Sequence, residues 1–316
     1  MPETTFSPKP IVITGPTGWI GRALLAQLHR KGDRDALAPG QEVRLFGSSD
    51  GSIAIGDGVT LPIRNLATIS AEDVADAHVI HLAYLTKDKV AVVGEEEFHR
   101  INRGIDDAVL DAISGCAPAS LFVASSGAAS LAEAGLDKHP YGLAKLEQEA
   151  RFLAWAEKFG VPALCGRIFN IAGPHINKLE AYAVSAFALQ ALGQGHIAIK
   201  ATQPVFRSFL HVEDLSRIIL RAARHGLGEP GPIDLCGAQV VEMSGIAQVV
   251  SEEVGGSITV ERPPIDYSSR SDYLGIAQET CIICMKLAVS PTGMRQQIRD
   301  TVEWIRELEG ASVTRN

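Results

Sequence analysis

The chain has 316 residues, of which 46% are hydrophobic and 21% charged, and its formal net charge is −8. This composition is ordinary for a globular protein with a large core, and the negative balance argues against a surface that binds nucleic acid or an anionic membrane. No basic segment followed by an apolar one opens the chain, and no apolar run approaches the roughly 20 residues of a membrane span. We therefore expect no secretory signal and no membrane segment.

Five cysteines over this length do not have the pattern of a disulfide framework. Three of the five are scattered or lie in apolar strands, as buried free thiols do. The exception is the pair Cys281 and Cys284 in CIIC. A single Cys-x-x-Cys with apolar middle residues is weak support for zinc or redox chemistry. We expect no metal, and a reducing cytoplasm is the simplest location.

Strands and helices alternate along the first half of the chain. Short apolar runs predict strands, and runs with an apolar residue every three or four positions predict helices. In chain order we expect strand 10–15, helix 19–32, strands 42–47 and 77–84, helix 98–115, strand 120–126, helix 140–160 and strand 161–170. This alternation is typical of a parallel sheet with helices on both faces.

The pattern loosens after about residue 172. The later segments predict helix 180–195, strand 196–200, helix 211–226, strand 231–237 and helix 295–308. We find no internal repeat and no low-complexity linker in the chain.

A glycine-rich turn joins the first predicted strand to the first predicted helix. Its sequence, TGPTGWIG, has glycine at positions 15, 18 and 21. Glycine permits a tight turn and lets backbone N–H groups approach a pyrophosphate, and the start of the helix favours the anion. A purely structural turn is the alternative, but the strand–turn–helix context favours dinucleotide binding.

Further motifs follow in order along the chain. They are HLAY at 81–84, Asn102 in RINRG, VASSGAAS at 123–130, YGLAK at 141–145, RIFNIAGP at 167–174 and RSFLHVEDL at 207–215. With these motifs the chain resembles the extended short-chain dehydrogenase/reductase family, which contains nucleotide-sugar epimerases and dehydratases. The resemblance covers residues 11–215, and TVEWI near the end fits the family's last helix. It implies a doubly wound parallel sheet (Rossmann fold) with a smaller, mainly C-terminal substrate-binding lobe.

Tyr141 and Lys145 lie four residues apart and therefore on one face of a predicted helix. Alone this spacing is common by chance. A tyrosine hydroxyl titrates near pH 10, and an ammonium one turn away lowers its pKa. The resemblance implies that Tyr141 is the acid/base, that Lys145 tunes it and holds the nicotinamide ribose, and that Ser126 donates to the substrate oxygen. Ser125 is the neighbouring alternative to Ser126.

The resemblance also implies an NAD or NADP site. Its predicted residues are Gly15, Thr17, Gly18, Trp19, Ile20, Gly21, Ser48, Asn65, Leu66, Leu82, Ala83, Tyr84, Asn102, Tyr141, Lys145 and Phe169. NAD sites usually present an acidic residue at the end of the second strand. Here Gly47 stands at that place, followed by serines, with Arg22 or Arg44 as possible phosphate partners. The sequence therefore favours NADP slightly over NAD.

For the substrate, the resemblance points to Asn170 and Arg207 beside a diphosphate, with Arg262 as a looser candidate. Arginine suits this task because its planar donor fork fits phosphate oxygens. His211 and Asp214 are interpreted as residues that cap a helix, and His81 as a residue that packs at a strand end.

One departure from the family's pattern argues against one class of reaction. The dehydratase branch of the family carries an Asp-Glu pair directly after its catalytic hydroxyl residue, whereas Gly127 and Ala128 follow Ser126. A dehydratase of that type is therefore disfavoured. The segment from Ser126 to Tyr141 is also shorter than is usual in the extended group. This loop often shapes the sugar pocket, so the identity of the sugar is left undetermined.

We predict an NAD(P)-dependent epimerase or ketoreductase that acts on a nucleotide-diphosphate sugar. Residues 1–172 with about 205–238 are expected to bind the cofactor, and residues 173–204 with 239–316 the substrate. A homodimer formed through the two long helices is expected. The alternatives are a reductase of a non-nucleotide carbonyl compound and a catalytically silent protein that senses the cofactor.

Overall fold

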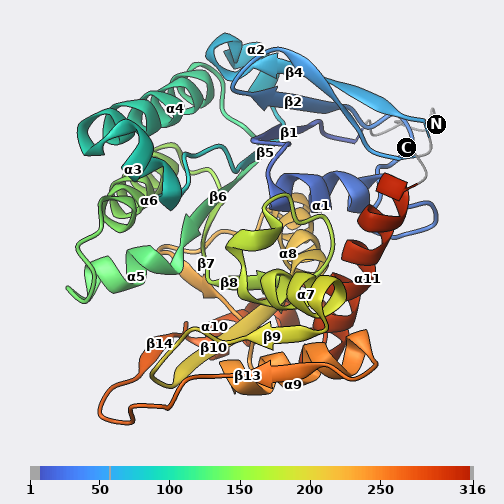
Figure 1. Cartoon of the computed structure of the whole chain (residues 1–316). Coiled ribbons are helices and arrows are strands. Elements are labelled where there is room, and N and C mark those ends of the chain that lie inside the picture. The colour runs from blue at the N-terminus through green and yellow to red at the C-terminus, as the bar shows by residue number, and fades with distance from the viewer. Residues whose placement is uncertain (1–7, 57, 314–316) are drawn as a thin grey trace. The chain divides into compact units, whose positions relative to one another are not determined.

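A computed structural model describes residues 8–56 and 58–313. The chain divides into two compact units, which are treated separately (Figure 1). Unit 1 comprises the described part of Met1–Arg167 and Ser216–Ile233, and unit 2 comprises Ile168–Leu215 and the described part of Asp234–Asn316. Which unit binds the cofactor and which the substrate remains a prediction.

The main sheet has the strand order β11-β7-β6-β5-β1-β2-β4-β3. Its strands are β1 (Ile11–Thr14), β2 (Val43–Gly47), β3 (Gly51–Ala54), β4 (Thr60–Asn65), β5 (His78–His81), β6 (Ser120–Ser126), β7 (Ala163–Ile168) and β11 (Ile233–Leu235). The pairs β1–β2, β1–β5, β5–β6 and β2–β4 are parallel, and β3 runs antiparallel to β4. The prediction of a mostly parallel sheet is confirmed.

Helices connect these strands. They are α1 (Trp19–Leu28), α2 (Ala71–Val74), α3 (Val90–Val93), α4 (Glu95–Gly115), α5 (Gly127–Glu133), α6 (Pro140–Phe159) and α8 (Val212–His225), with short 3-10 turns η1 (Leu66–Thr68) and η2 (Lys87–Lys89). Pro140 at the first turn of α6 and the left-handed Gly160 after its end fix the limits of that helix. Figure 1 shows α4 and α6 side by side on one side of the sheet and α1 on the other.

The space between the sheet and the α4/α6 layer is filled by apolar side chains. Phe46, Val109 and Phe152 are fully buried there, and Trp155 is 8% exposed. Each such side chain contributes roughly 1.5–3 kcal/mol by leaving water. This packing fixes α4 and α6 against the sheet. Tyr141 and Lys145, which are predicted to be catalytic, lie on the first two turns of α6.

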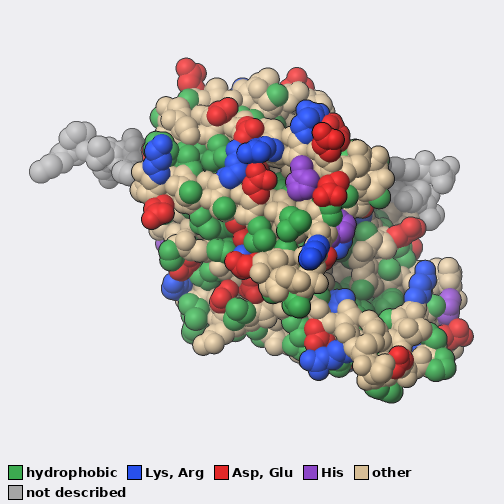
Figure 2. All heavy atoms as spheres, turned by 90° about the vertical axis from the view of Figure 1, so that its left-hand side faces the viewer, with side chains coloured by type: hydrophobic (Ala, Val, Ile, Leu, Met, Phe, Trp, Pro, Cys, Tyr) green, Lys and Arg blue, Asp and Glu red, His purple; other side chains and the backbone are tan. Residues whose placement is uncertain are grey.

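The outward faces of α4 and α6 carry charges of both signs. Arg103 pairs with Glu147, and Arg151 pairs with Asp107, each pair joining the two helices. On the side of unit 1 that bears these helices, Figure 2 shows acidic and basic side chains next to one another. Exposed pairs of this kind contribute little to stability, about 0–1 kcal/mol each.

Unit 2 contains smaller sheets and the helices that cover them. The strands β12, β10 and β14 lie side by side, β8 pairs with β10, and β9 pairs with β13. The bounds are β8 (Asn170–Ala172), η3 (Leu179–Ala181), α7 (Ala183–Gln194), β9 (His196–Ala198), β10 (Val205–His211), β12 (Val240–Glu242), α9 (Met243–Val254), β13 (Thr259–Glu261), β14 (Ser271–Tyr273), α10 (Ala277–Lys286) and α11 (Met294–Val313). Its core includes Ile197, Ile246 and Ile298.

The predicted bounds differ from the structure at several places, most clearly at one strand. The strand expected at 161–170 ends at Ile168. The Phe169 N–H still donates to the Leu235 carbonyl, and the chain then continues as β8, which pairs with β10. The CIIC segment lies on α10, with Cys284 buried and both thiols unbridged. Among the residues that the structure describes, no helix is long and apolar enough to cross a membrane, and no cluster of three or more His, Cys, Asp or Glu side chains could hold a metal.

Candidate active site

The glycine turn lies at the point where the strand order of the main sheet reverses. β1 has β2 on one side and β5 on the other, so the loops that follow β1 and β5 diverge at their carboxyl ends. In open α/β sheets this switch point is the usual place for a ligand. Gly15 follows β1, and Leu82 and Ala83 follow β5.

Gly15 and Gly21 of the turn each occupy a place where a side chain would not fit. Gly15 has φ +72°, and a Cβ there would lie 2.9 Å from the Ala83 nitrogen. A Cβ on Gly21 would lie 2.5 Å from the Gly15 oxygen and 2.7 Å from Pro16 Cα. These distances are too short for any side chain, so the turn, the start of α1 and the loop after β5 pack backbone against backbone.

Gly18 differs from the other two glycines. A Cβ on it would meet only the Gly15 oxygen, at an ordinary 3.5 Å. Gly18 is the N-cap of α1 and has no side chain that could cap its first turn. The N–H groups at the start of a helix are suited to a phosphate. The turn therefore fits the diphosphate of a dinucleotide.

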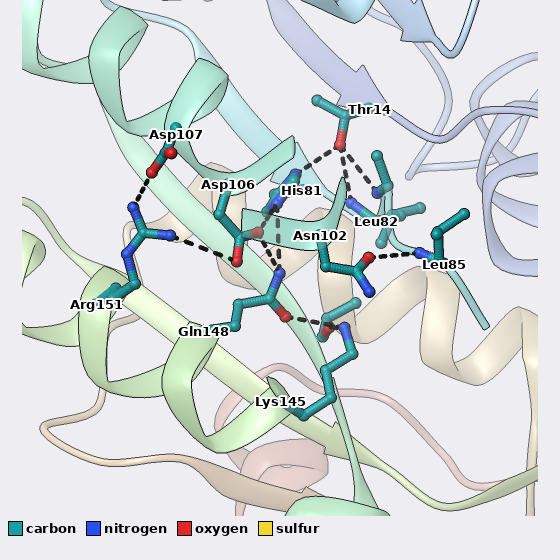
Figure 3. A network of polar contacts seen from close by, with 12 residues as sticks. Thr14, His81, Leu82, Leu85, Asn102, Asp106, Asp107, Lys145, Gln148 and Arg151 are labelled. Atoms are coloured by element: carbon teal, nitrogen blue, oxygen red, sulfur yellow. Dashed lines mark hydrogen bonds and ion pairs between the residues drawn. The ribbon is translucent and has the colours of Figure 1, made fainter. Parts of the chain in front are cut away.

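Asn102 adds a second feature that fits a ligand. It is 1% exposed, and its Oδ1 accepts from the Leu85 N–H at 2.8 Å (Figure 3). Its Nδ2 is buried without an acceptor among the described residues. A buried donor left without a partner is costly, roughly 1–3 kcal/mol, and a bound polar group would remove that cost.

The residues predicted on the adenine side of the cofactor lie where β2 and β4 end. Ser48 is exposed after β2, and Asp50 Oδ1 accepts from the Asn65 N–H at 2.7 Å. The loop after β2 thus brings a carboxylate back to the end of β4, three residues beyond Gly47. The Asn65 side chain caps η1 by accepting from the Ala67 N–H.

The two arginines suggested for a phosphate are both engaged. Arg44 bonds Glu42 and the carbonyls of Glu72 and Asp73. Arg22 donates to the Thr17 carbonyl at 3.0 Å. Arg44 is thus committed to structure away from Ser48, and only Arg22 lies at the glycine turn.

Tyr141 and Lys145 lie on the first two turns of α6, as predicted. Tyr141 is partly exposed, and its ring packs edge-on against Tyr84 with centroids 6.3 Å apart. Lys145 is 3% exposed. Its Nζ donates to the Ala124 carbonyl at 2.7 Å and to Gln148 Oε1 at 2.9 Å, and lies 3.6 Å from the centre of the Tyr84 ring.

Burial governs the titration of this lysine. Desolvation lowers the pKa of Lys145 from 10.5 to about 8, and the nearby Asp106 opposes that shift. Burial also raises the pKa of Tyr84 far above its usual value, so this phenol stays protonated. The Lys145 ammonium therefore loses its charge as the pH rises through about 8, close to the physiological range.

Ser125 and Ser126 point to opposite faces of β6, as neighbours on a strand do. The Ser125 hydroxyl donates to Glu149, whose carboxylate is held bidentately by Arg167 at 2.9 and 2.7 Å. The Ser126 hydroxyl accepts from the Ala128 N–H at the start of α5. Ser125 is thus committed to a buried ion pair, which favours Ser126 as the serine that meets a substrate.

The remaining predicted residues belong to unit 2. Phe169 is buried against Tyr273, with ring centroids 5.0 Å apart. Asn170 Nδ2 donates to the carbonyls of Ser208 and Tyr273 at 3.3 and 3.4 Å. Their assignment to cofactor and substrate remains a prediction.

The two candidate arginines differ in how firmly they are held. Arg207 donates to the carbonyls of Phe206 and Ser271, and burial lowers its pKa. Arg262 Nη1 donates to both carboxylate oxygens of Glu242 at 2.8 and 2.9 Å, and the other two guanidinium nitrogens donate to two carbonyls. Arg262 has little donor capacity left for a ligand, so Arg207 is the better candidate.

The histidines have structural partners. His211 accepts from the Glu213 N–H at the start of α8, and Asp214 accepts from the Thr292 N–H. His81 is buried at the end of β5 and bonds Thr14 and Asp106. These contacts agree with the interpretation that these residues serve the fold.

Sequence reasoning did not single out Asp106, Gln148 or Glu149. Asp106 lies one helical turn beyond Asn102, and Gln148 and Glu149 lie one turn beyond Lys145. All three are polar residues at positions that face the core. Helical spacing from the motif residues would have identified them.

The fold and this site define an α/β protein with a dinucleotide turn and a Tyr-x-x-x-Lys helix. The model of the NAD dependent epimerase/dehydratase family matches residues 11–235. The chain belongs to this family, as the motifs of the sequence indicated.

Individual relatives are more distant. UDP-glucuronic acid decarboxylase 3 of Arabidopsis thaliana is 28% identical over 142 residues, which span 44% of this chain and 41% of that protein. The solved structure of UDP-N-acetylglucosamine 4-epimerase from Methanobrevibacter ruminantium has TM-score 0.74 and 19% identity, covering 96% of this chain and 99% of the other. UDP-glucose 4-epimerase of Thermus thermophilus in complex with NAD has TM-score 0.69 and 22% identity, covering 94% and 99%. At these identities the structural likeness concerns the fold.

Proposed function

We propose that the chain is a nicotinamide-dinucleotide-dependent epimerase or ketoreductase that acts on a nucleotide-diphosphate sugar. The observation that carries the proposal is the buried Lys145 ammonium on α6, one helical turn from Tyr141 and bonded to the Ala124 carbonyl near the end of β6. Membership of the family supports an enzyme of this class, and the names of its relatives refer to UDP sugars.

The proposed roles follow from the positions of the side chains. Gly15, Gly18 and Gly21 admit the diphosphate, and Asn102 offers an unpaired donor. A bound nicotinamide dinucleotide supplies a carbon that accepts and returns hydride. Tyr141 exchanges a proton with a sugar hydroxyl or keto oxygen, the charge of Lys145 favours its phenolate, and Ser126 donates to the same oxygen.

The choice of cofactor is the finer part of the proposal. The exposed Ser48 and Ser49 gave the sequence its slight preference for NADP. Asp50 follows Gly47 by three residues, and a carboxylate near the ribose would repel a 2′-phosphate. The proposal therefore names a nicotinamide dinucleotide, and titration with both forms decides between them.

Elimination of water in the manner of the dehydratase branch is not part of the proposal. Gly127 and Ala128, which follow Ser126, are buried at the start of α5 and carry no carboxylate. The nearby Glu133 and Glu149 are both paired with Arg167.

A proposed homodimer would use α4 and α6, and its test is the mass of the protein in solution.

A thermal-shift screen of nucleotide sugars with NAD and NADP tests the proposal. A ligand at a hundred times its Kd stabilises the folded protein by about 2.7 kcal/mol. We expect one cofactor and one class of nucleotide sugar to raise the melting temperature. Arg207→Ala is expected to abolish the shift caused by the sugar nucleotide and to retain that of the cofactor.

Arg270→Ala is the matched control, because Arg270 is an exposed arginine of unit 2 that pairs with Asp272. It should leave both shifts unchanged. If no nucleotide sugar shifts the melting temperature while a small carbonyl compound is reduced, the alternative reductase is correct. If cofactor binds and no compound is turned over, the sensor is correct.

A further inference from the structure

A chain of buried polar groups connects Lys145 to the end of β1 (Figure 3). Gln148 Oε1 accepts from Lys145 Nζ at 2.9 Å, and Gln148 Nε2 donates to Asp106 Oδ1 at 2.7 Å. The same Asp106 oxygen lies 3.1 Å from His81 Nε2, and His81 Nδ1 lies 2.8 Å from Thr14 Oγ1. All five side chains are buried, from 0% to 3% exposed.

The direction of each hydrogen bond follows from Thr14. Its Oγ1 accepts from the N–H groups of Leu82 and Ala83, both at 3.1 Å. Its hydroxyl hydrogen is therefore left for His81 Nδ1, which must accept, and His81 Nε2 carries the hydrogen that points to Asp106. Asp106 thus receives two donors on one oxygen, and its hydrogen-bonded link to Lys145 runs through Gln148.

The three hydrogens of the Lys145 ammonium also have defined directions. Two point to the Ala124 carbonyl and to Gln148 Oε1, and the third side of the ammonium faces the Tyr84 ring at 3.6 Å. The carbonyl is backbone and the ring offers no single acceptor atom. Gln148 is therefore the side chain that fixes where the ammonium points.

Titratable groups from several elements surround Lys145. They are Asp106 on α4; Tyr141, Glu149 and Arg151 on α6; Cys165 on β7; and His81 at the end of β5 with Tyr84 just after it. Burial raises the pKa values of Cys165 and Tyr84, which keeps both groups neutral. Glu149 is neutralised by its bidentate pair with Arg167.

Asp106 is different from Glu149. Its nearest cation is Arg151, whose guanidinium lies 3.9 Å from Asp106 Oδ2 but bonds directly to the neighbouring Asp107. The negative charge of Asp106 is thus the one that the surroundings leave available to the buried ammonium.

We propose that Asp106 and Gln148 are positioning residues for Lys145: Gln148 sets the direction of the ammonium, and the Asp106 carboxylate, acting through the Gln148 amide, keeps it charged in the absence of solvent. The proposal rests on the proposed function only for its consequence in catalysis. The arrangement in the cofactor-free protein stands on the contacts themselves.

The pKa of Lys145, lowered by burial to about 8, supports this assignment, because the Asp106 charge is the largest influence that opposes the lowering. Without that charge the ammonium would lose its proton at a lower pH. Tyr141 would then lose the neighbour that makes its phenolate accessible.

The test is the titration of Lys145 in Asp106→Asn, measured by NMR of isotope-labelled lysine in the cofactor-free protein. The signal is assigned from its loss in Lys145→Met. Asparagine keeps the size of the side chain and can still accept from Gln148, so the variant removes mainly the charge. We expect the pKa of Lys145 to fall by about one unit.

Asp107→Asn is the matched control, since it removes the same charge one residue along α4 from a side chain that is 51% exposed and bonds Arg151. It should shift the titration by less than about a third of that amount, because water screens an exposed charge. Equal shifts in the two variants, or no shift in either, would overturn the proposal.

Gln148→Met tests the link itself and serves if Asp106→Asn does not fold. It retains the Asp106 charge and removes both hydrogen bonds, so the pKa of Lys145 should again fall; an unchanged value contradicts the role of Gln148. In turnover, the alkaline limb of the pH profile should move down with the lysine titration. If the titration moves and that limb does not, the positioning stands and the proposed function fails.

Discussion

Replacing Tyr141 by phenylalanine is expected to lower turnover by about a hundred- to ten-thousandfold, the usual contribution of a positioned acid/base. The variant removes one oxygen and keeps the ring that packs against Tyr84 and Phe98. The helix and the partners of Lys145 should persist, so the cofactor should bind within about threefold of its original affinity, well under the roughly 1.4 kcal/mol that a tenfold change represents. Initial rates on the sugar found by the screen, together with cofactor titration, measure both effects.

Tyr267→Phe is the control for this experiment, because Tyr267 is 79% exposed on unit 2. It should retain full turnover. Undiminished turnover in Tyr141→Phe would remove Tyr141 from the proposed chemistry. A loss of turnover that comes with an equal loss of cofactor affinity would make Tyr141 a binding residue instead.

Gly15→Ala should abolish cofactor binding, with a loss of at least about a hundredfold in affinity, or about 2.7 kcal/mol. The new Cβ would lie 2.9 Å from the Ala83 nitrogen and 3.0 Å from its Cα, both of which are backbone atoms. The loops after β1 and β5 must move apart, and the turn can no longer present its N–H groups together. Equilibrium titration with NAD and NADP measures the loss.

Gly32→Ala separates the clash from backbone strain. Gly32 has φ +75°, close to the +72° of Gly15, but a Cβ there meets nothing within 4 Å. Both variants carry the cost of a left-handed alanine, roughly 1–2 kcal/mol of stability. Only Gly15→Ala should lose the cofactor. Normal binding by Gly15→Ala would show that the turn is structural and that the dinucleotide site lies elsewhere.

The sequence was sufficient for the parts of the molecule in which local pattern and position coincide. The glycine turn was identified because strand, glycines and helix follow one another within eleven residues of the chain, residues 11–21. Tyr141 and Lys145 share a helix face because the period of the helix is fixed. Gly160 marked the end of α6 for a similarly local reason.

Other features depend on contacts between distant segments. The strand expected at 161–170 is divided because β8 pairs with β10, some forty residues later in the chain. The place of the Asp50 carboxylate depends on its loop, which folds back so that this carboxylate accepts from the Asn65 N–H. The connection from Lys145 through Gln148 to Asp106 and His81 joins α6, α4 and β5, and no local pattern brings these residues together.

The most direct measurement of the central claim follows the hydrogen on the sugar carbon. The protein is mixed with its cofactor and a nucleotide sugar that carries deuterium at the carbon to be oxidised, and the reaction is quenched during turnover. The account predicts deuterium in the nicotinamide ring by mass spectrometry, and far less of it when Tyr141→Phe replaces the original protein. Product that forms while the nicotinamide stays unlabelled would contradict the account.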